Sequence, residues 1–239
     1  MQNLLPLTVT LMLICGGNAV SLLAQQTPAA TSKTTQKAAT VPAVPAVDEW
    51  KDDFDGKVLD ATKWERFTFE GGSGGKLKVE DGQLRMRGVA ASRAGVRSKQ
   101  TFVADHFILE AKIAKVGVPL PEIGQSVTQP GNAVLTVLFD GSGRNRIEWI
   151  LTSAKTFEAW LITDGRGERL DNHNLGTKET SPIIAIARRG NDLFFLLNGE
   201  VGLQKSVSNL PRAFHVMLYG FGSSENNWDS VRVVTAKQP

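Results

Sequence analysis

The stretch HFILEAKIA, residues 106–114, indicates the fold class, because its apolar and polar side chains alternate with a period of two. One side of this segment is predicted to be apolar, with Phe107, Leu109, Ala111 and Ile113. The opposite side carries the polar residues His106, Glu110 and Lys112, with Ile108 as an apolar exception. A strand with one buried and one polar face is typical of an antiparallel sheet.

The same alternation recurs from residue 50 onward, between short breaks that contain Gly or Asn. In segment 144–152, Ile147, Trp149 and Leu151 are predicted to point inward while Arg146 and Glu148 point outward. The pairs Asp81-Gly82 and Asn198-Gly199 are typical of tight hairpin turns. Further strands are predicted over 76–80, 83–87, 132–139, 157–163, 183–189, 193–197, 201–205, 213–220 and 230–235. We therefore predict an all-β sandwich of two antiparallel sheets.

Composition excludes several classes of function. The 239 residues are 41% hydrophobic, which is enough for one packed core, and a single Cys excludes a disulfide framework. Of the net charge of +3, Lys33 and Lys37 in a linker supply two units, and the remaining basic residues alternate with acidic ones without a dense Lys/Arg block. We do not expect nucleic-acid binding.

The amino-terminal region is predicted to direct export. Residues 1–24 are uncharged, with an apolar core from Leu4 to Ile14, and form a signal peptide with cleavage after Ala24. An uncleaved anchor is the alternative, and a lipoprotein at Cys15 is disfavoured by the bulky Ile14. Residues 25–46 form a flexible Thr/Ala/Pro linker and 47–239 the β-sandwich domain. We expect a secreted or periplasmic protein without membrane insertion after cleavage.

The order of several segments resembles a known group of proteins. The opening DDFDG of residues 52–56, the strand HFILEAKI of 106–113 and the closing WDSVRV of 228–233 are similar to glycoside hydrolase family 16. The stretch FFLLNG of 194–199 resembles laminin G-type sandwiches. The resemblance spans most of residues 50–235 and implies a concanavalin A-like jelly roll with ligands on the concave face.

The catalytic motif of family 16 is incomplete. The resemblance implies two carboxylates from one strand, as Glu-x-Asp-x-(x)-Glu, and retaining hydrolysis needs them about 5–5.5 Å apart. The matching strand contains Glu148, but Ile150 and Thr152 stand where the other carboxylates belong. We therefore predict no catalytic residue.

The resemblance also implies a structural calcium ion. The matching ligands are Asp53, Gly82 and Asp229, which offer the oxygen atoms that calcium prefers. The alternative is that Asp229 merely begins a strand at the surface.

The alternation predicts a polar ligand face displayed to solvent. Its candidate carbohydrate-binding residues are Glu110, Arg146, Glu148, Glu158, Trp160, His215 and Tyr219. Aromatic rings stack on sugar C–H faces while charged groups bond the hydroxyls. The first hypothesis is a non-catalytic module that binds a polysaccharide or glycan. The alternatives are a glycoside hydrolase or lyase that pairs Glu148 with Glu110 or His215, and a protein-interaction module.

Overall fold

The computed structural model describes residues 48–69, 75–87, 94–118, 132–152, 156–174, 181–221 and 225–236, all within the unit Ala38–Pro239. The predicted signal peptide and the predicted linker lie outside the described residues. Within the described ranges, no helix is long and apolar enough to cross a membrane.

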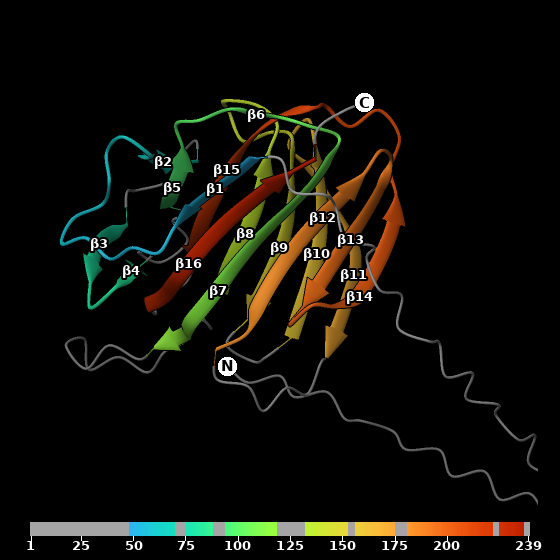
Figure 1. Ribbon diagram of the computed structural model, residues 1–239. Coiled ribbons are helices and arrows are strands. Elements are labelled where there is room, and N and C mark those ends of the chain that lie inside the picture. The colour runs from blue at the N-terminus through green and yellow to red at the C-terminus, as the bar shows by residue number, and fades with distance from the viewer. Residues whose placement is uncertain are drawn as a thin grey trace, which may run out of the picture. The chain divides into compact units, whose positions relative to one another are not determined.

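Two antiparallel sheets form a sandwich (Figure 1), as the alternation predicted. The front sheet has the order β14-β13-β12-β7-β16-β4-β3, and β1 pairs with β16. Its strands are β1 (Asp48–Asp52), β3 (Lys76–Glu80), β4 (Gln83–Arg87), β7 (His106–Val118), β12 (Ile183–Arg189), β13 (Asp192–Leu197), β14 (Glu200–Ser206) and β16 (Glu225–Thr235).

The back sheet has the order β11-β10-β9-β8-β15-β5-β2, and β6 pairs with β15. Its strands are β2 (Trp64–Thr68), β5 (Ala94–Ser98), β6 (Phe102–Val103), β8 (Asn132–Leu138), β9 (Arg146–Thr152), β10 (Thr156–Thr163), β11 (Arg166–Asn174) and β15 (Ala213–Phe221). Strand β8 lies between β9 and β15 and is buried along its whole length.

The core lies between the two sheets. The inward residues of β7 and β9 belong to one cluster of buried side chains, which includes Leu109, Ile113, Ile147 and Trp149. Trp149 is 2% exposed, and its indole Nε1 donates to the carbonyl of Leu196 across the sandwich at 3.0 Å. The predicted inward face is therefore confirmed.

The turn chemistry is also confirmed. Asp81 and Gly82 have positive φ angles of 55° and 67°, and Asn198 and Gly199 have 50° and 83°. These left-handed conformations are the ones that Gly and Asn adopt at low cost, so each pair closes a tight hairpin.

Candidate functional site

Six of the seven predicted ligand residues share the outer face of the back sheet. Glu148 on β9 pairs with Trp160 on β10 and with Thr136 on β8, and Thr136 pairs with Met217 on β15. Directly paired residues project to the same side of a sheet. The remaining predicted residues on this face are Arg146, Glu158, His215 and Tyr219.

The prediction that Glu110 lies on this face is wrong. Glu110 is in β7 of the front sheet, where its carboxylate accepts a hydrogen bond of 3.0 Å from Arg232 on β16. Alternation along a strand separates the core side from the outer side. It does not indicate which of two stacked sheets contains the strand, and this is why the prediction failed. Glu110 therefore does not pair with Glu148.

The three central residues form a buried network rather than an exposed one. The Glu148 carboxylate accepts hydrogen bonds from Arg146 Nε and from the Tyr219 hydroxyl, and Arg146 Nη1 donates to the carbonyl of Gly143. Arg146, Glu148 and Tyr219 are 6%, 5% and 1% exposed. The expectation that Arg146 and Glu148 are displayed to solvent is therefore wrong, although they point to the predicted side.

Phe69, which follows β2, helps to cover this network. Its ring centre lies 4.7 Å from the Arg146 guanidinium and 5.2 Å from the ring of Tyr219. A Cβ on Gly143 would come within 2.7 Å of Phe69, and Gly143 has a φ of +79°, so this turn position requires glycine.

Apolar side chains occupy much of the same outer face. They form a second cluster of buried residues, against which Phe69 and Trp160 pack: Phe67, Val134, Leu138, Ile150, Met217 and Tyr219. Ile150, which the resemblance to family 16 matches to a carboxylate position, is 5% exposed within this cluster. The sequence shows an isoleucine at this position of the motif, but it did not predict how far the apolar cluster extends.

Trp160 and Glu158 on β10 are only half-buried. The Trp160 indole Nε1 donates to Glu158 Oε2 at 2.9 Å, which orients both side chains. One edge of the indole lies against β11, where a Cβ on Gly167 would be 3.4 Å from the ring. An oriented aromatic ring beside a carboxylate offers both contacts that a sugar uses.

Two further polar groups on this face have no hydrogen-bond partner among the described residues. They are Thr136 Oγ1, whose residue is 0% exposed, and Asn132 Oδ1, whose residue is 9% exposed. Both come from β8, the strand whose sequence is otherwise almost entirely apolar. The sequence signal that could have identified Thr136 and Asn132 is a polar residue within an otherwise apolar central strand. Such a residue stands out because buried polar groups usually have a hydrogen-bond partner.

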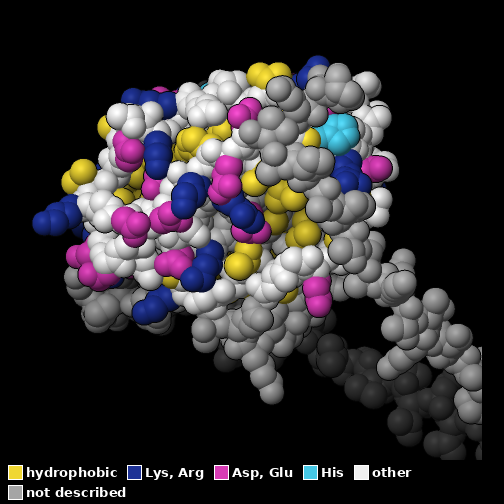
Figure 2. Space-filling model, viewed as in Figure 1, with side chains coloured by type: hydrophobic (Ala, Val, Ile, Leu, Met, Phe, Trp, Pro, Cys, Tyr) yellow, Lys and Arg dark blue, Asp and Glu magenta, His cyan; other side chains and the backbone are white. Residues whose placement is uncertain are grey.

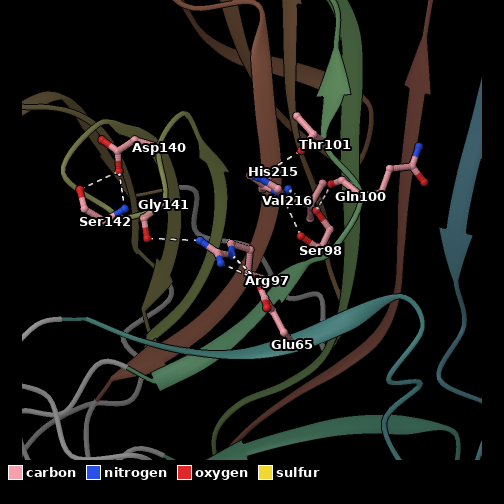
Figure 3. A network of polar contacts seen from close by, with 10 residues as sticks. All are labelled: Glu65, Arg97, Ser98, Gln100, Thr101, Asp140, Gly141, Ser142, His215 and Val216. Carbon is pink, nitrogen blue, oxygen red and sulfur yellow. Dashed lines mark hydrogen bonds and ion pairs between the residues drawn. The ribbon is translucent and has the colours of Figure 1, made fainter.

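The predicted residue His215 belongs to a network at one end of the face (Figure 3). Its Nδ1 lies 2.9 Å from the carbonyl of Ser98 and its Nε2 lies 3.3 Å from Thr101 Oγ1. Both ring nitrogens therefore face neighbours at the β5 end of the sheet. This arrangement gives no support to a catalytic pair of His215 with Glu148.

Arg97 ties the edge of the sheet to the turn between β8 and β9, and Asp140 holds that turn together. Arg97 Nε donates to Glu65 Oε1 at 2.8 Å, and Arg97 Nη1 donates to the carbonyl of Gly141 at 3.2 Å. Partial burial raises the pKa of Asp140, but hydrogen bonds outweigh this effect and lower it overall. The donors are the side chains of Asn145 and Ser142 and the backbone of Gly143 and Arg144.

Two of the three predicted calcium ligands, Asp229 and Asp53, are paired with lysines. Asp229 accepts a hydrogen bond of 2.5 Å from Lys112, and the Asp53 carboxylate lies 3.3 Å from Lys51. A Cβ built on Gly82 would lie 3.8 Å from Asp55 Oδ1. No cluster of three or more His, Cys, Asp or Glu suited to a metal occurs in the part of the chain that the structure describes. Calcium at these residues stays a prediction.

Comparison with solved structures identifies the fold. A structure from work on endo-acting O-glycanases, which human gut bacteria express to initiate mucin breakdown, matches with a TM-score of 0.60 at 18% identity over 79% of this chain and 99% of that one. The endo-β-1,3-glucanase of Pyrococcus furiosus matches with a TM-score of 0.60 at 12% identity, over 80% and 94% of the two chains. A non-specific endo-β-1,3(4)-glucanase of family GH16 gives 0.59 at 13%, over 84% and 95%.

The chain has the concanavalin A-like jelly-roll fold. The predicted resemblance to family 16 is thus confirmed at the level of architecture, and identities this low establish the fold alone. No family model matches the sequence, and no curated protein matches it at a significant level.

Proposed function

We propose that this protein is an exported module that binds a polysaccharide or glycan on the outer face of the back sheet without cleaving it. The observation that supports it most is the half-buried Trp160, whose indole Nε1 is fixed by Glu158 beside an otherwise apolar face. The ring supplies a stacking surface and Glu158 accepts hydrogen bonds from hydroxyl groups. That similar folds are found in glycan-cleaving enzymes is consistent with the proposal.

The chemistry of the face favours binding over hydrolysis. Glu148 is held by Arg146 and Tyr219, so its carboxylate is committed to a network within the protein. Ile150 and Thr152 follow on the same side of β9 and provide no second carboxylate. A double displacement at a sugar requires both a nucleophile and an acid, and one carboxylate cannot serve as both.

Binding to a glycan array and migration in polysaccharide-containing gels test the proposal. We expect Trp160→Ala to weaken binding at least tenfold, which corresponds to about 1.4 kcal/mol, and Glu158→Gln to weaken it several-fold. Glu110→Gln is the matched control, because it removes the same charge from the other sheet and should bind as the wild type does.

Two results would contradict the proposal. The first is that no glycan on the array binds, or that Trp160→Ala binds as well as the wild type. The second is the release of new reducing ends or unsaturated sugars from a polysaccharide panel, abolished by Glu148→Gln. That outcome would assign the face to a hydrolase or lyase.

A further inference from the structure

One row of paired residues crosses the outer face of the back sheet from β2 at one edge to β11 at the other. Cross-strand pairing links its members in the order Glu65, Arg97, Met217, Thr136, Glu148, Trp160 and Arg169. Directly paired residues project to the same side of a sheet, so Arg169 on β11 lies on the face that carries Trp160. Gly167, two residues before Arg169, supports this placement, because a Cβ on Gly167 would lie 3.4 Å from the Trp160 ring.

The arginines at the two ends of this row differ in their partners. Arg97 Nε donates to Glu65 on the neighbouring strand at 2.8 Å. Arg169 is exposed, and no hydrogen bond or ion pair joins it to another group in the part of the chain that the structure describes. Its guanidinium is therefore available to a ligand at the position next to Trp160.

The front sheet shows the more usual arrangement of surface charges. Figure 2 views the outer face of that sheet, where basic and acidic side chains lie next to one another. Arg232 donates to Glu110 there at 3.0 Å, and Lys112 donates to Asp229 at 2.5 Å. These cations are neutralised within the protein, whereas the charge of Arg169 is not neutralised by any described residue.

Two charged residues flank Trp160 in different directions. Glu158 lies two residues back along β10, about 7 Å away, and Arg169 lies one strand spacing away on β11, about 5 Å. The Glu158 carboxylate accepts the hydrogen bond from Trp160 Nε1 at 2.9 Å, which holds the carboxylate on its own side of the ring. A saccharide that stacks on the indole therefore meets an acceptor at one edge and a cation at another.

We propose that the ligand of this face is an acidic saccharide, which stacks on Trp160 and directs a carboxylate or sulfate group to Arg169. This inference rests on the proposed function, since it names the class of glycan that the same site binds. A guanidinium presents several N–H donors in one plane, and these match the oxygen atoms of a planar or tetrahedral anion. Hydroxyl groups at another edge of the same sugar unit donate to Glu158. Uronic acids and sulfated sugars carry both kinds of group on one ring.

A neutral saccharide fits this site less well. A ligand stacked on Trp160 removes water from the side of Arg169 that faces it, and a charge that loses water without gaining a partner costs free energy. A neutral sugar offers this charge only hydroxyl groups, whereas an anionic group offsets the cost with charge-assisted hydrogen bonds. The same cation thus favours acidic glycans and disfavours neutral ones, which is how one residue gives specificity.

A glycan array printed with matched pairs tests the proposal. Each acidic polysaccharide is paired with an uncharged derivative of the same backbone: polygalacturonate with its methyl ester, alginate with its methyl ester, and dextran sulfate with dextran. We expect the wild type to bind at least one acidic member about tenfold or more tightly than its uncharged partner, which corresponds to about 1.4 kcal/mol. The carboxylate pairs and the sulfate pair distinguish the two possible anions.

Three variants assign the preference to a residue. Arg169→Gln should reduce the acidic preference to about twofold or less, and it should melt at the wild-type temperature because Arg169 is exposed. Arg232→Gln is the matched control, since it removes a guanidinium from the other sheet and should keep the preference. Trp160→Ala should weaken the binding of both members of a pair.

Ionic strength provides a second measurement. Raising it from about 0.01 M to about 0.1 M shortens the screening length from about 30 Å to about 10 Å, so the wild type should lose more affinity for the acidic member than Arg169→Gln does.

Three results would overturn the proposal, and they separate it from the proposed function. If an uncharged glycan binds best and Trp160→Ala weakens it while Arg169→Gln does not, the face binds sugar but its ligand is not acidic. If no glycan binds, this inference and the proposed function both fail. If the acidic preference persists in Arg169→Gln, a different cation recognises the anion.

Discussion

Replacing Glu148 by Gln removes the charge that faces the Arg146 guanidinium in a site where both residues are less than 10% exposed. Breaking a buried ion pair by removing one partner costs about 3–5 kcal/mol. In this variant Arg146 keeps its hydrogen bond to the carbonyl of Gly143 and its contact with the ring of Phe69. We therefore expect a loss of unfolding free energy at the low end of this range, about 3 kcal/mol. In a domain of this size, that loss lowers the melting temperature by about 6–12 °C.

The assay is equilibrium unfolding in urea, followed by the fluorescence of the tryptophans. Arg146→Met combined with Glu148→Leu replaces both charges by apolar groups of similar size, and we expect this double variant to recover most of the lost stability. Glu158→Gln is the control, a half-buried carboxylate on the neighbouring strand, with an expected loss below about 1 kcal/mol.

Two outcomes would refute this reasoning. One is that the free energy of unfolding of Glu148→Gln lies within about 0.5 kcal/mol of the wild-type value, the range typical of surface substitutions. The other is that the effects of Arg146→Met and Glu148→Leu, each measured alone, simply add in the double variant, because residues that form one buried network are coupled.

Three more outcomes are expected. Gly95→Ala should lower the free energy of unfolding in urea by about 3 kcal/mol, because a Cβ at this position would lie 2.1 Å from the Leu218 carbonyl oxygen and 2.5 Å from Tyr219 Cβ. Gly202→Ala is the control, since its Cβ would lie 3.6 Å from the nearest neighbour, and it should lower the free energy of unfolding by less than half as much. Asp140→Asn should cost about 1–2 kcal/mol at neutral pH. Folding lowers the pKa of Asp140 below its ordinary value of 3.8, so the contribution of this carboxylate to stability is complete above pH 3.8. That contribution is lost as the pH falls through the lower pKa of the folded state. A stability difference between Asp140→Asn and the wild type that persists unchanged down to pH 2 would contradict this. Finally, 5 mM calcium should raise the melting temperature relative to EDTA, and Asp229→Asn should abolish the rise; equal melting temperatures would reject the calcium site.

Local sequence patterns predicted the fold where the signal lay within one strand or one turn. The period-two alternation of β7 and β9 depends only on which side of the strand faces the core, and the Asp-Gly and Asn-Gly turns depend on backbone conformations that these residues favour. Strand β11, which runs from Arg166 to Asn174, was not among the predicted strands. Its polar sequence resembles a turn because β11 is an edge strand of the back sheet.

The candidate site was predicted less completely, because its character depends on contacts between distant segments. Alternation placed Glu148 on the outer side of β9, but its burial involves Phe69, which precedes it by 79 positions. Phe69 can lie there only because Gly143 has no side chain. Contacts between residues this far apart in the sequence leave no periodic pattern in the local sequence.

The same contacts restrict where a ligand can lie on the back sheet. Val134, Leu138, Ile150 and Met217 are buried across the middle of the outer face, so this region is a second small core rather than an open polar cleft. The groups predicted to contact sugar and still partly accessible are His215, engaged at the β5 end, and the Trp160–Glu158 pair near the β11 edge. A saccharide is therefore expected to lie along β10 and β11, where Trp160 can stack on it, and Glu148 then stabilises the sheet beneath the ligand without touching it.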